Sequence, residues 1–165
     1  MIGVDGTIYV GSDDYKFYAV RPDGSRKWSS RTSGTVESPA AIGAGGTLYF
    51  GCDDQHVSPY PSMSNLYAMN PDGTQRWVLA IAGGSMRAPV IGVDGTIYIS
   101  TRKTFYAVKP DGTLKWTFAP SQFGALSSPA IGAENTIYLG SSYYYTGAHS
   151  QSGRLYAFHP DGTLN

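Results

Sequence analysis

Short runs in which apolar and polar residues alternate recur along the whole chain. The clearest runs are rich in Ile, Val, Leu and Tyr and occupy residues 7–11, 47–51, 96–100 and 136–140. Each is followed by a second run of the FYAV or LYAM type, at residues 17–20, 66–69, 105–108 and 155–158. Runs of this length with β-branched and aromatic residues predict β-strands rather than helices.

Two further segments complete a repeating unit of four predicted strands. A segment ending in Ile comes before the first run, at residues 38–42, 88–91 and 128–131. A segment ending in Lys-Trp or Arg-Trp comes after the second run, at residues 27–28, 76–77 and 115–116. Repeats of about 40 residues with four short strands each predict the blades of a β-propeller.

The turns between the predicted strands fall into two groups. Asp-Gly, Gly-Gly or Glu-Asn lies between strands one and two, and Pro-Asp-Gly lies between strands three and four, beginning at Pro22, Pro71, Pro110 and Pro160. These residues favour tight hairpins, so this end of every blade is predicted to be alike.

The connections at the opposite end differ in length. Between strands two and three, residues 12–16 and 101–104 form short loops, whereas 52–65 and 141–154 form long ones. Copies one and three begin IGVDG and copies two and four begin IGA, which indicates duplication of a two-blade unit.

The predicted fold is therefore an all-β propeller in one domain, 1–165, with antiparallel four-stranded blades. The blades cover about residues 1–36, 37–86, 87–126 and 127–165, and the last lacks most of its outer strand. Four blades cover half of an eight-bladed ring and leave two apolar blade faces exposed. We expect a homodimer that completes the ring; a tightly curved four-bladed monomer and a fragment of a longer propeller are the alternatives.

The repeated pattern SPAIG, DGTIYVG, LYA and PDGT followed by Lys-Trp resembles the pyrroloquinoline-quinone-like propeller repeat. This repeat occurs in quinoprotein dehydrogenases and in related non-enzymatic propellers. The resemblance implies blades around a channel and docking tryptophans between neighbouring blades, here Trp28, Trp77 and Trp116. It also points to a periplasmic or extracellular location. The enzymes use adjacent cysteines and calcium-binding ligands for the quinone, and the single Cys52 has no neighbouring cysteine. No cofactor is therefore predicted, and pyrroloquinoline quinone or calcium is the alternative.

Composition narrows the possible partners. Twelve basic and twelve acidic residues cancel, which argues against nucleic acid and anionic membranes because both require a basic patch. No apolar stretch approaches the length of a membrane span, and no secretory signal is visible. The single cysteine excludes an intrachain disulfide and a cysteine-based metal cluster.

No convincing catalytic group emerges from the residue pattern. His56 and His149 lie in the two long loops and would form a metal site if the loops met, but solvated histidines are the favoured interpretation. The acidic pairs at 13–14 and 53–54 follow strand two in copies one and two. They would suit calcium or acid–base chemistry, although turn capping is the commoner role, and no metal site is predicted.

Candidate binding residues gather at the end with variable loops. The long loops carry Tyr60, Tyr143, Tyr144 and Tyr145, whose rings suit contacts with sugars or peptides unless they pack on their own loops. Glu37, Arg87 and Ser127 precede strand one at positions predicted to match, and Arg87 suits a carboxylate or phosphate.

These residues favour a non-enzymatic scaffold that binds a protein, peptide or glycan through the variable-loop face. A fragment of a quinone-dependent dehydrogenase and a purely structural repeat module are the alternatives.

Overall fold

The computed structural model describes residues 1–53, 63–120, 125–144 and 151–165, and its strands form four antiparallel sheets, here called blades 1 to 4. Two single-turn 3-10 helices, η1 (Ala44–Gly46) and η2 (Ala133–Asn135), accompany them. Blade 1 comprises β1 (Ile8–Ser12), β2 (Lys16–Val20) and β3 (Arg26–Arg31). Blade 2 comprises β4 (Ala41–Ile42), β5 (Leu48–Asp53), β6 (Met63–Met69) and β7 (Gln75–Ala82). Blade 3 comprises β8 (Val90–Ile91), β9 (Ile97–Ser100), β10 (Phe105–Val108) and β11 (Leu114–Phe118). Blade 4 comprises β12 (Ala125–Leu126), β13 (Ala130–Ile131), β14 (Ile137–Tyr144) and β15 (Gln151–Phe158).

In blades 1, 2 and 3 the strands pair in the order of the chain. Blades 2 and 3 have the orders β4-β5-β6-β7 and β8-β9-β10-β11. In blade 4, β15 pairs along one edge of β14, while β12 and β13 pair with β14 at separate points. In blade 1 the isolated bridge Ile2–Ile8 takes the place of an inner strand. In blade 4 the isolated bridge Phe158–Leu164 takes the place of an outer strand.

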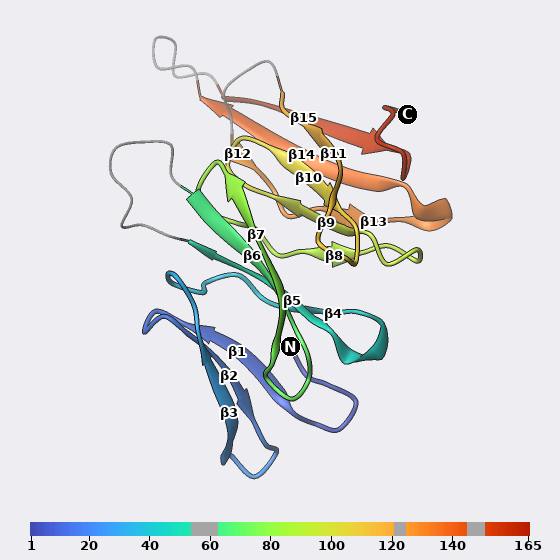
Figure 1. Ribbon diagram of the computed structural model, residues 1–165. Coiled ribbons are helices and arrows are strands. Elements are labelled where there is room, and N and C mark those ends of the chain that lie inside the picture. The colour runs from blue at the N-terminus through green and yellow to red at the C-terminus, as the bar shows by residue number, and fades with distance from the viewer. Residues whose placement is uncertain (54–62, 121–124, 145–150) are drawn as a thin grey trace.

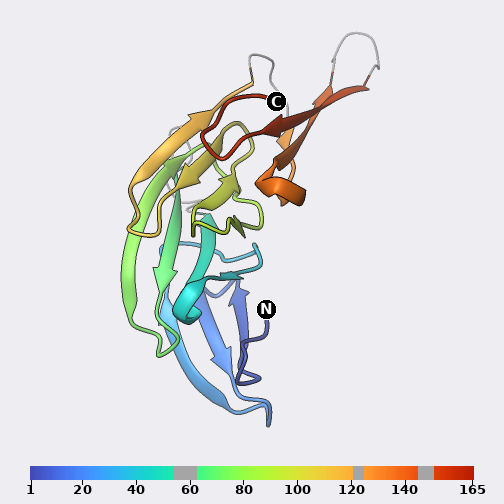
Figure 2. The same ribbon diagram turned by 90° about the vertical axis from the view of Figure 1, so that its right-hand side faces the viewer.

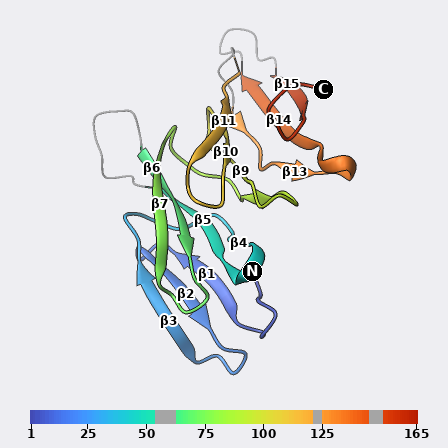
Figure 3. The same cartoon turned by 45° about the vertical axis from the view of Figure 1, so that its right-hand side comes forward.

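The four blades follow one another along an arc, which Figure 2 shows from the side with the outer strands β3, β7 and β11 on the convex edge. Blades 1 and 4 lie at opposite ends of this arc in all views (Figures 1, 2 and 3). The alternative of a closed four-bladed monomer is therefore wrong. Each blade stacks on its neighbour instead of curling around to meet the far end.

The two ends of the blades have different structures. At one end, here called the turn end, lie η1, η2 and the Pro-Asp-Gly turns; at the other, the hairpin end, β5–β6 and β14–β15 project (Figure 1). The second residue of each tight turn between strands one and two is a glycine or Asn135. Its φ is positive in every blade, from 59° at Asn135 to 80° at Gly95. Each Pro-Asp-Gly glycine is also left-handed, at 84° to 93°. Because glycine lacks a Cβ and asparagine tolerates the left-handed region, the predicted turns form where the sequence places them.

Strand lengths differ from the prediction at the inner and outer edges. The inner strands β4, β8 and β13 are only two residues long, since Pro39, Pro89 and Pro129 come before them and lack an N–H for pairing. The outer strands do not end at Trp but continue to Arg31, Ala82 and Phe118. The prediction that they end on Lys-Trp or Arg-Trp is wrong because pairing with the third strand continues beyond the tryptophan.

The core consists of three apolar layers, one between each pair of neighbouring blades. At the turn end of each layer a tryptophan of one blade donates a hydrogen bond from Nε1 to a proline carbonyl of the next. The pairs are Trp28–Pro71 at 2.9 Å, Trp77–Pro110 at 2.9 Å and Trp116–Pro160 at 3.0 Å. These contacts join each blade to its successor in the same way.

The indole also lies against the glycine of the Pro-Asp-Gly turn that supplies the carbonyl. A Cβ placed on Gly73 would lie 2.8 Å from the ring of Trp28. Corresponding distances are 2.9 Å for Gly112 and Trp77, and 2.8 Å for Gly162 and Trp116. The glycine is therefore required twice, for its left-handed backbone and for the space that the indole occupies.

Candidate binding face at the hairpin end

Two of the four hairpins reach further than the others at this end of the molecule. Pairing of β5 with β6 continues to Asp53–Ser64, and pairing of β14 with β15 continues to Tyr144–Gln151. The predicted long loops at 52–65 and 141–154 are therefore partly wrong, since strand pairing extends into both. The paired residues in blades 2 and 4 lengthen these two sheets at the hairpin end.

Tyr143 and Tyr144 lie within β14 rather than in a loop. Tyr143 is half-buried and stands opposite Ser152 on β15. The other ring and imidazole candidates of the long loops, Tyr60, Tyr145, His56 and His149, lie outside the described residues. Tyr143 is thus the aromatic candidate whose position the structure defines.

Arg87 lies at the inner edge of blade 3, just before β8. Its backbone N–H donates to the Ser100 carbonyl at 2.8 Å, and its Nε donates to the Leu126 carbonyl of blade 4 at 3.2 Å. The side chain is half-buried. A guanidinium carries further N–H donors beyond Nε, so this contact positions the group without using its full capacity for a carboxylate or phosphate.

Glu37 does not occupy the position that matches Arg87. Backbone or side-chain hydrogen bonds pair Ser38 with Gly51, Arg87 with Ser100 and Ser127 with Gly140, so Ser38 is the residue that matches. The predicted match in position between Glu37 and Arg87 is off by one residue because Pro39 stands three residues before Ile42, whereas the prolines of blades 3 and 4 stand two before the corresponding Ile. The Glu37 side chain is exposed to solvent.

Asp53 serves the packing between blades 2 and 3. Its buried carboxylate accepts hydrogen bonds from the Met86 backbone N–H at 2.9 Å and from Ser64 Oγ at 3.3 Å. Both partners come from the protein itself, so the carboxylate satisfies a buried donor where the chain enters blade 3. This arrangement agrees with a capping role.

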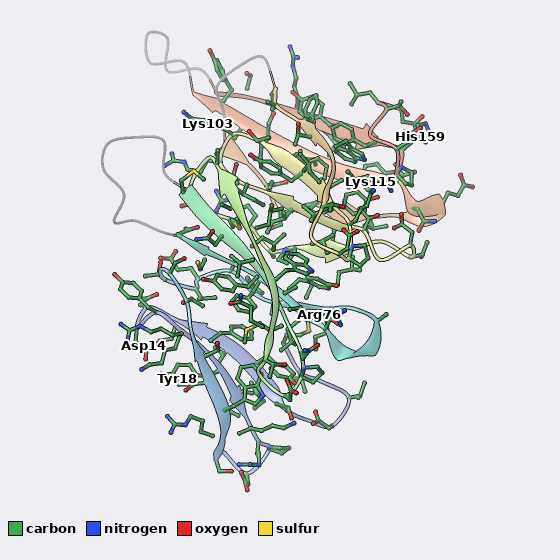
Figure 4. All side chains as sticks on the ribbon, in the orientation of Figure 1. Asp14, Tyr18, Arg76, Lys103, Lys115 and His159 are labelled. Carbon is green, nitrogen blue, oxygen red and sulfur yellow. The ribbon has the colours of Figure 1, made fainter. Side chains whose placement is uncertain are left out.

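Asp14 belongs to a surface cluster on blade 1, where it lies close to Tyr18 (Figure 4). The Tyr18 hydroxyl donates to Asp14 Oδ2, and Lys16 Nζ lies 3.1 Å from the same oxygen. The hydrogen bond from Tyr18 is the main reason that the pKa of Asp14 is lowered to about 2. A carboxylate held in this way keeps its charge but has protein partners already.

A polar cluster between blades 1 and 2 was not indicated by the sequence pattern. The Ser33 N–H donates to the Tyr67 hydroxyl at 3.0 Å, and Ser33 Oγ accepts from Asn65 Nδ2 at 2.7 Å. Cys52 Sγ lies 3.1 Å from Ser33 Oγ and is buried. Burial raises the pKa of Tyr67. Ser33 belongs to an irregular connection, so only the fold brings these four residues together.

The described residues contain no group of three His, Cys, Asp or Glu side chains placed to hold a metal ion. In the same residues, no helix is long and apolar enough to cross a membrane.

Comparison with solved structures agrees with the architecture. The crystal structure of BamB from Moraxella catarrhalis matches 99% of this chain with a TM-score of 0.73 and 15% identity, and the match covers 46% of that chain. A protein of unknown function from Bacteroides caccae matches 90% of this chain and 56% of its own length, with a TM-score of 0.55 and 13% identity. No protein-family model and no curated protein matches the sequence.

The chain has the fold of about half a β-propeller. It spans about half the length of these two solved proteins, and at this identity the likeness establishes the fold. The all-β propeller predicted from the repeats is confirmed. In this half-propeller, the hairpin end combines the two lengthened hairpins of blades 2 and 4 with Arg87 at the inner edge of blade 3, which lies between them.

Proposed function

We propose that this half-propeller is a non-enzymatic scaffold that binds a protein, peptide or glycan at its hairpin end. The observation that supports this proposal is the contrast between the ends of the blades. All four blades share their turns at one end, while the hairpins at the other end differ in length. Functional variation in repeat folds concentrates on surfaces that the scaffold does not need for its own packing.

Two described side chains suit such contacts. The Arg87 guanidinium, oriented by the Leu126 carbonyl, suits an acidic group. Tyr143, half-buried in β14, offers a ring face together with a polar hydroxyl. Because the Leu126 carbonyl already holds the Arg87 side chain, little conformational entropy is lost when a ligand contacts this group.

A screen with defined probes tests this proposal. A phage-displayed random peptide library and a glycan array would be applied to the unmodified chain, and every hit would be measured again with Arg87→Ala and Tyr143→Ala. We expect at least one class of hit, weakened about tenfold or more by one of these changes. Val93→Ala at the turn end is the control and should bind normally. The absence of hits, or hits that only Val93→Ala weakens, would contradict the proposal.

We also propose that two copies complete one ring. The chain matches about half of the BamB propeller, so two copies supply about as many blades as one whole propeller. Ring closure would cover the outward sides of blades 1 and 4. Light scattering should give a mass of twice 17.7 kDa. A mass of a single chain throughout a dilution series would exclude this assembly without affecting the proposed binding face.

A further inference from the structure

Every junction inside the chain joins two distinct surfaces. We call the side of a blade that meets the following blade its forward face, and the side that meets the preceding blade its rear face. Each forward face presents a tyrosine from the second strand of the blade (β1, β5, β9 or β14) and an apolar residue from the third strand (β2, β6, β10 or β15). Each rear face presents two apolar residues from the second strand. At the junction of blades 1 and 2, Tyr9 and Phe17 pack against Leu48 and Phe50.

These positions are covered at all three junctions. The forward tyrosines Tyr9, Tyr49 and Tyr98 are 1–5% exposed, and the forward residues Phe17, Leu66 and Phe105 are fully buried. The rear residues of blades 2, 3 and 4 are at most 1% exposed: Leu48, Phe50, Ile97, Ile99, Ile137 and Leu139. Contact between the faces therefore buries a repeated set of large apolar side chains.

The same positions are exposed where a blade has no neighbour. On the rear face of blade 1, Ile8 is 39% and Val10 is 47% exposed. On the forward face of blade 4, Tyr138 is 40% and Leu155 is 74% exposed. Blade 1 thus displays an unused rear face and blade 4 an unused forward face, and each carries the apolar residue types that the internal junctions bury.

One internal contact shows which residues would meet. Phe17 on the forward face of blade 1 stacks on Phe50 on the rear face of blade 2, with ring centroids 3.8 Å apart. Leu155 occupies the position of Phe17 in its blade, and Val10 occupies the position of Phe50. A junction of the internal type would therefore place Leu155 of one chain against Val10 of another.

We infer that the forward face of blade 4 in each copy docks on the rear face of blade 1 in the other copy. Two equal junctions then close the ring. This inference rests on the proposed two-chain ring and adds how the copies pair. A second copy is the fitting partner because each chain carries both halves of the interface. Two head-to-tail contacts related by a twofold axis form a closed assembly.

The new junctions differ from the internal ones at the turn end. A Cβ on Gly24 of blade 1 would meet no atom within 4 Å, whereas Gly73, Gly112 and Gly162 each face an indole. All three tryptophans of the chain already contact these glycines. A second copy therefore brings no indole to Gly24, and we expect the copies to separate on dilution before the blades unfold.

Charge substitutions at the paired positions test the inference. Val10→Lys or Leu155→Glu places an unpaired charge in both junctions, so each single variant should raise the dissociation constant of the dimer at least about tenfold. The double variant, Val10→Lys with Leu155→Glu, places opposite charges together at both junctions. It should recover the two-chain mass at low salt and lose it again at high salt.

Matched controls separate docking from general effects. Val93→Lys changes an exposed valine at the turn end, and Leu114→Glu changes an exposed leucine on β11. Both should keep the mass of the unmodified chain. Circular dichroism and thermal unfolding would show that each variant is folded. If a charge variant does not fold, Val10→Ala and Leu155→Ala serve instead, each with a smaller rise in the dissociation constant.

The outcomes distinguish the two proposals. An unmodified chain that stays single at every concentration excludes the proposed ring itself. If the unmodified chain forms dimers, but either single variant still pairs normally, the copies meet through two identical faces and the head-to-tail inference is overturned. Failure of the double variant to regain the dimer at low salt would also overturn it.

Discussion

The turn end and the hairpin end of the blades are built from the same strands, yet they behave differently from copy to copy. At the turn end, three indole-to-carbonyl hydrogen bonds have lengths between 2.9 and 3.0 Å. At the hairpin end, pairing stops at Ser12–Lys16 in blade 1 but continues to Tyr144–Gln151 in blade 4. Packing between blades therefore constrains the turn end and leaves the hairpin end free to vary.

The constraint has a physical origin in shared residues. A Pro-Asp-Gly turn must close its own hairpin and also accept the tryptophan of the preceding blade, so a change in the turn affects two blades. A longer hairpin at the opposite end extends only its own sheet. Substitutions at the two ends should therefore differ in their effect on stability.

The largest effect is expected for Trp77→Ala. This change removes the apolar body between blades 2 and 3 and the hydrogen bond to Pro110, and it should lower the free energy of unfolding by about 3 kcal/mol. Denaturant titration measures the loss. Trp77→Phe keeps part of the packing, so its stability should lie between those of the unmodified chain and Trp77→Ala. A loss for Trp77→Ala no larger than that of a surface substitution would show that packing between blades does not constrain the turn end.

A pair of glycine substitutions isolates the indole contact. Gly73→Ala and Gly24→Ala both force alanine into a left-handed backbone, with φ of 90° and 84°, which costs about 1–2 kcal/mol in either case. Only Gly73 faces Trp28, so Gly73→Ala should lower stability by about 1 kcal/mol more. Equal losses in thermal unfolding would show that the indole adapts to the methyl group.

A smaller effect is expected for the ion pair at the turn end of blade 3, where Lys115 Nζ lies 3.1 Å from Asp94 Oδ2 (Figure 4 labels Lys115). Partial burial raises the pKa of Asp94, but hydrogen bonds from Thr96 and the charge of Lys115 outweigh it and lower that pKa to about 2. The folded pKa lies below the ordinary 3.8, so the charged form stabilises the fold above that pH, and the contribution disappears as the pH falls through 2.

Asp94→Asn should therefore flatten the pH dependence of unfolding between pH 3.8 and about 2. Because about half of the Asp94 side chain is exposed, the difference near neutral pH should be no more than about 0.5 kcal/mol. Denaturant midpoints at several pH values measure it. Lys115→Met is the companion variant, and an unchanged pH profile in both would contradict a stabilising role for this pair.

The smallest effect on stability is expected at the hairpin end. Tyr143→Ala alters a half-buried side chain in the lengthened part of β14, beyond the layers that join the blades, and should change the free energy of unfolding by less than about 0.5 kcal/mol. Thermal unfolding beside Trp77→Ala makes the comparison direct. A loss as large as that of Trp77→Ala would show that the hairpin end is part of the core.

Sequence patterns predicted the repeat, the blades and the tight turns because these depend on near neighbours along the chain. Pro-Asp-Gly and Asp-Gly favour particular backbone angles within a few residues. The extents of the strands were less predictable. Whether residues after Trp28 or before Leu66 continue a strand depends on the pairing partner opposite, which the local pattern does not specify.

The candidate site was predicted in part. Arg87 was identified from its position before strand one, but its partner, the Leu126 carbonyl, belongs to the next blade. Glu37 lies one residue before Ser38, which pairs with Gly51, because blade 2 has one more residue between its proline and the following isoleucine than blades 3 and 4 have. The Ser33–Cys52–Asn65–Tyr67 cluster had no sequence signal, since its members come from three separate segments.

The amino-acid sequence by itself determined where the chain turns, which residues alternate between the two faces of each sheet, and that the unit repeats four times. These features follow from backbone preferences and from side-chain alternation. Only the folded structure shows how far each strand runs, which residues match between blades, and which apolar side chains meet at each junction between blades. Those outcomes depend on hydrogen bonds and packing between residues that are distant in the chain.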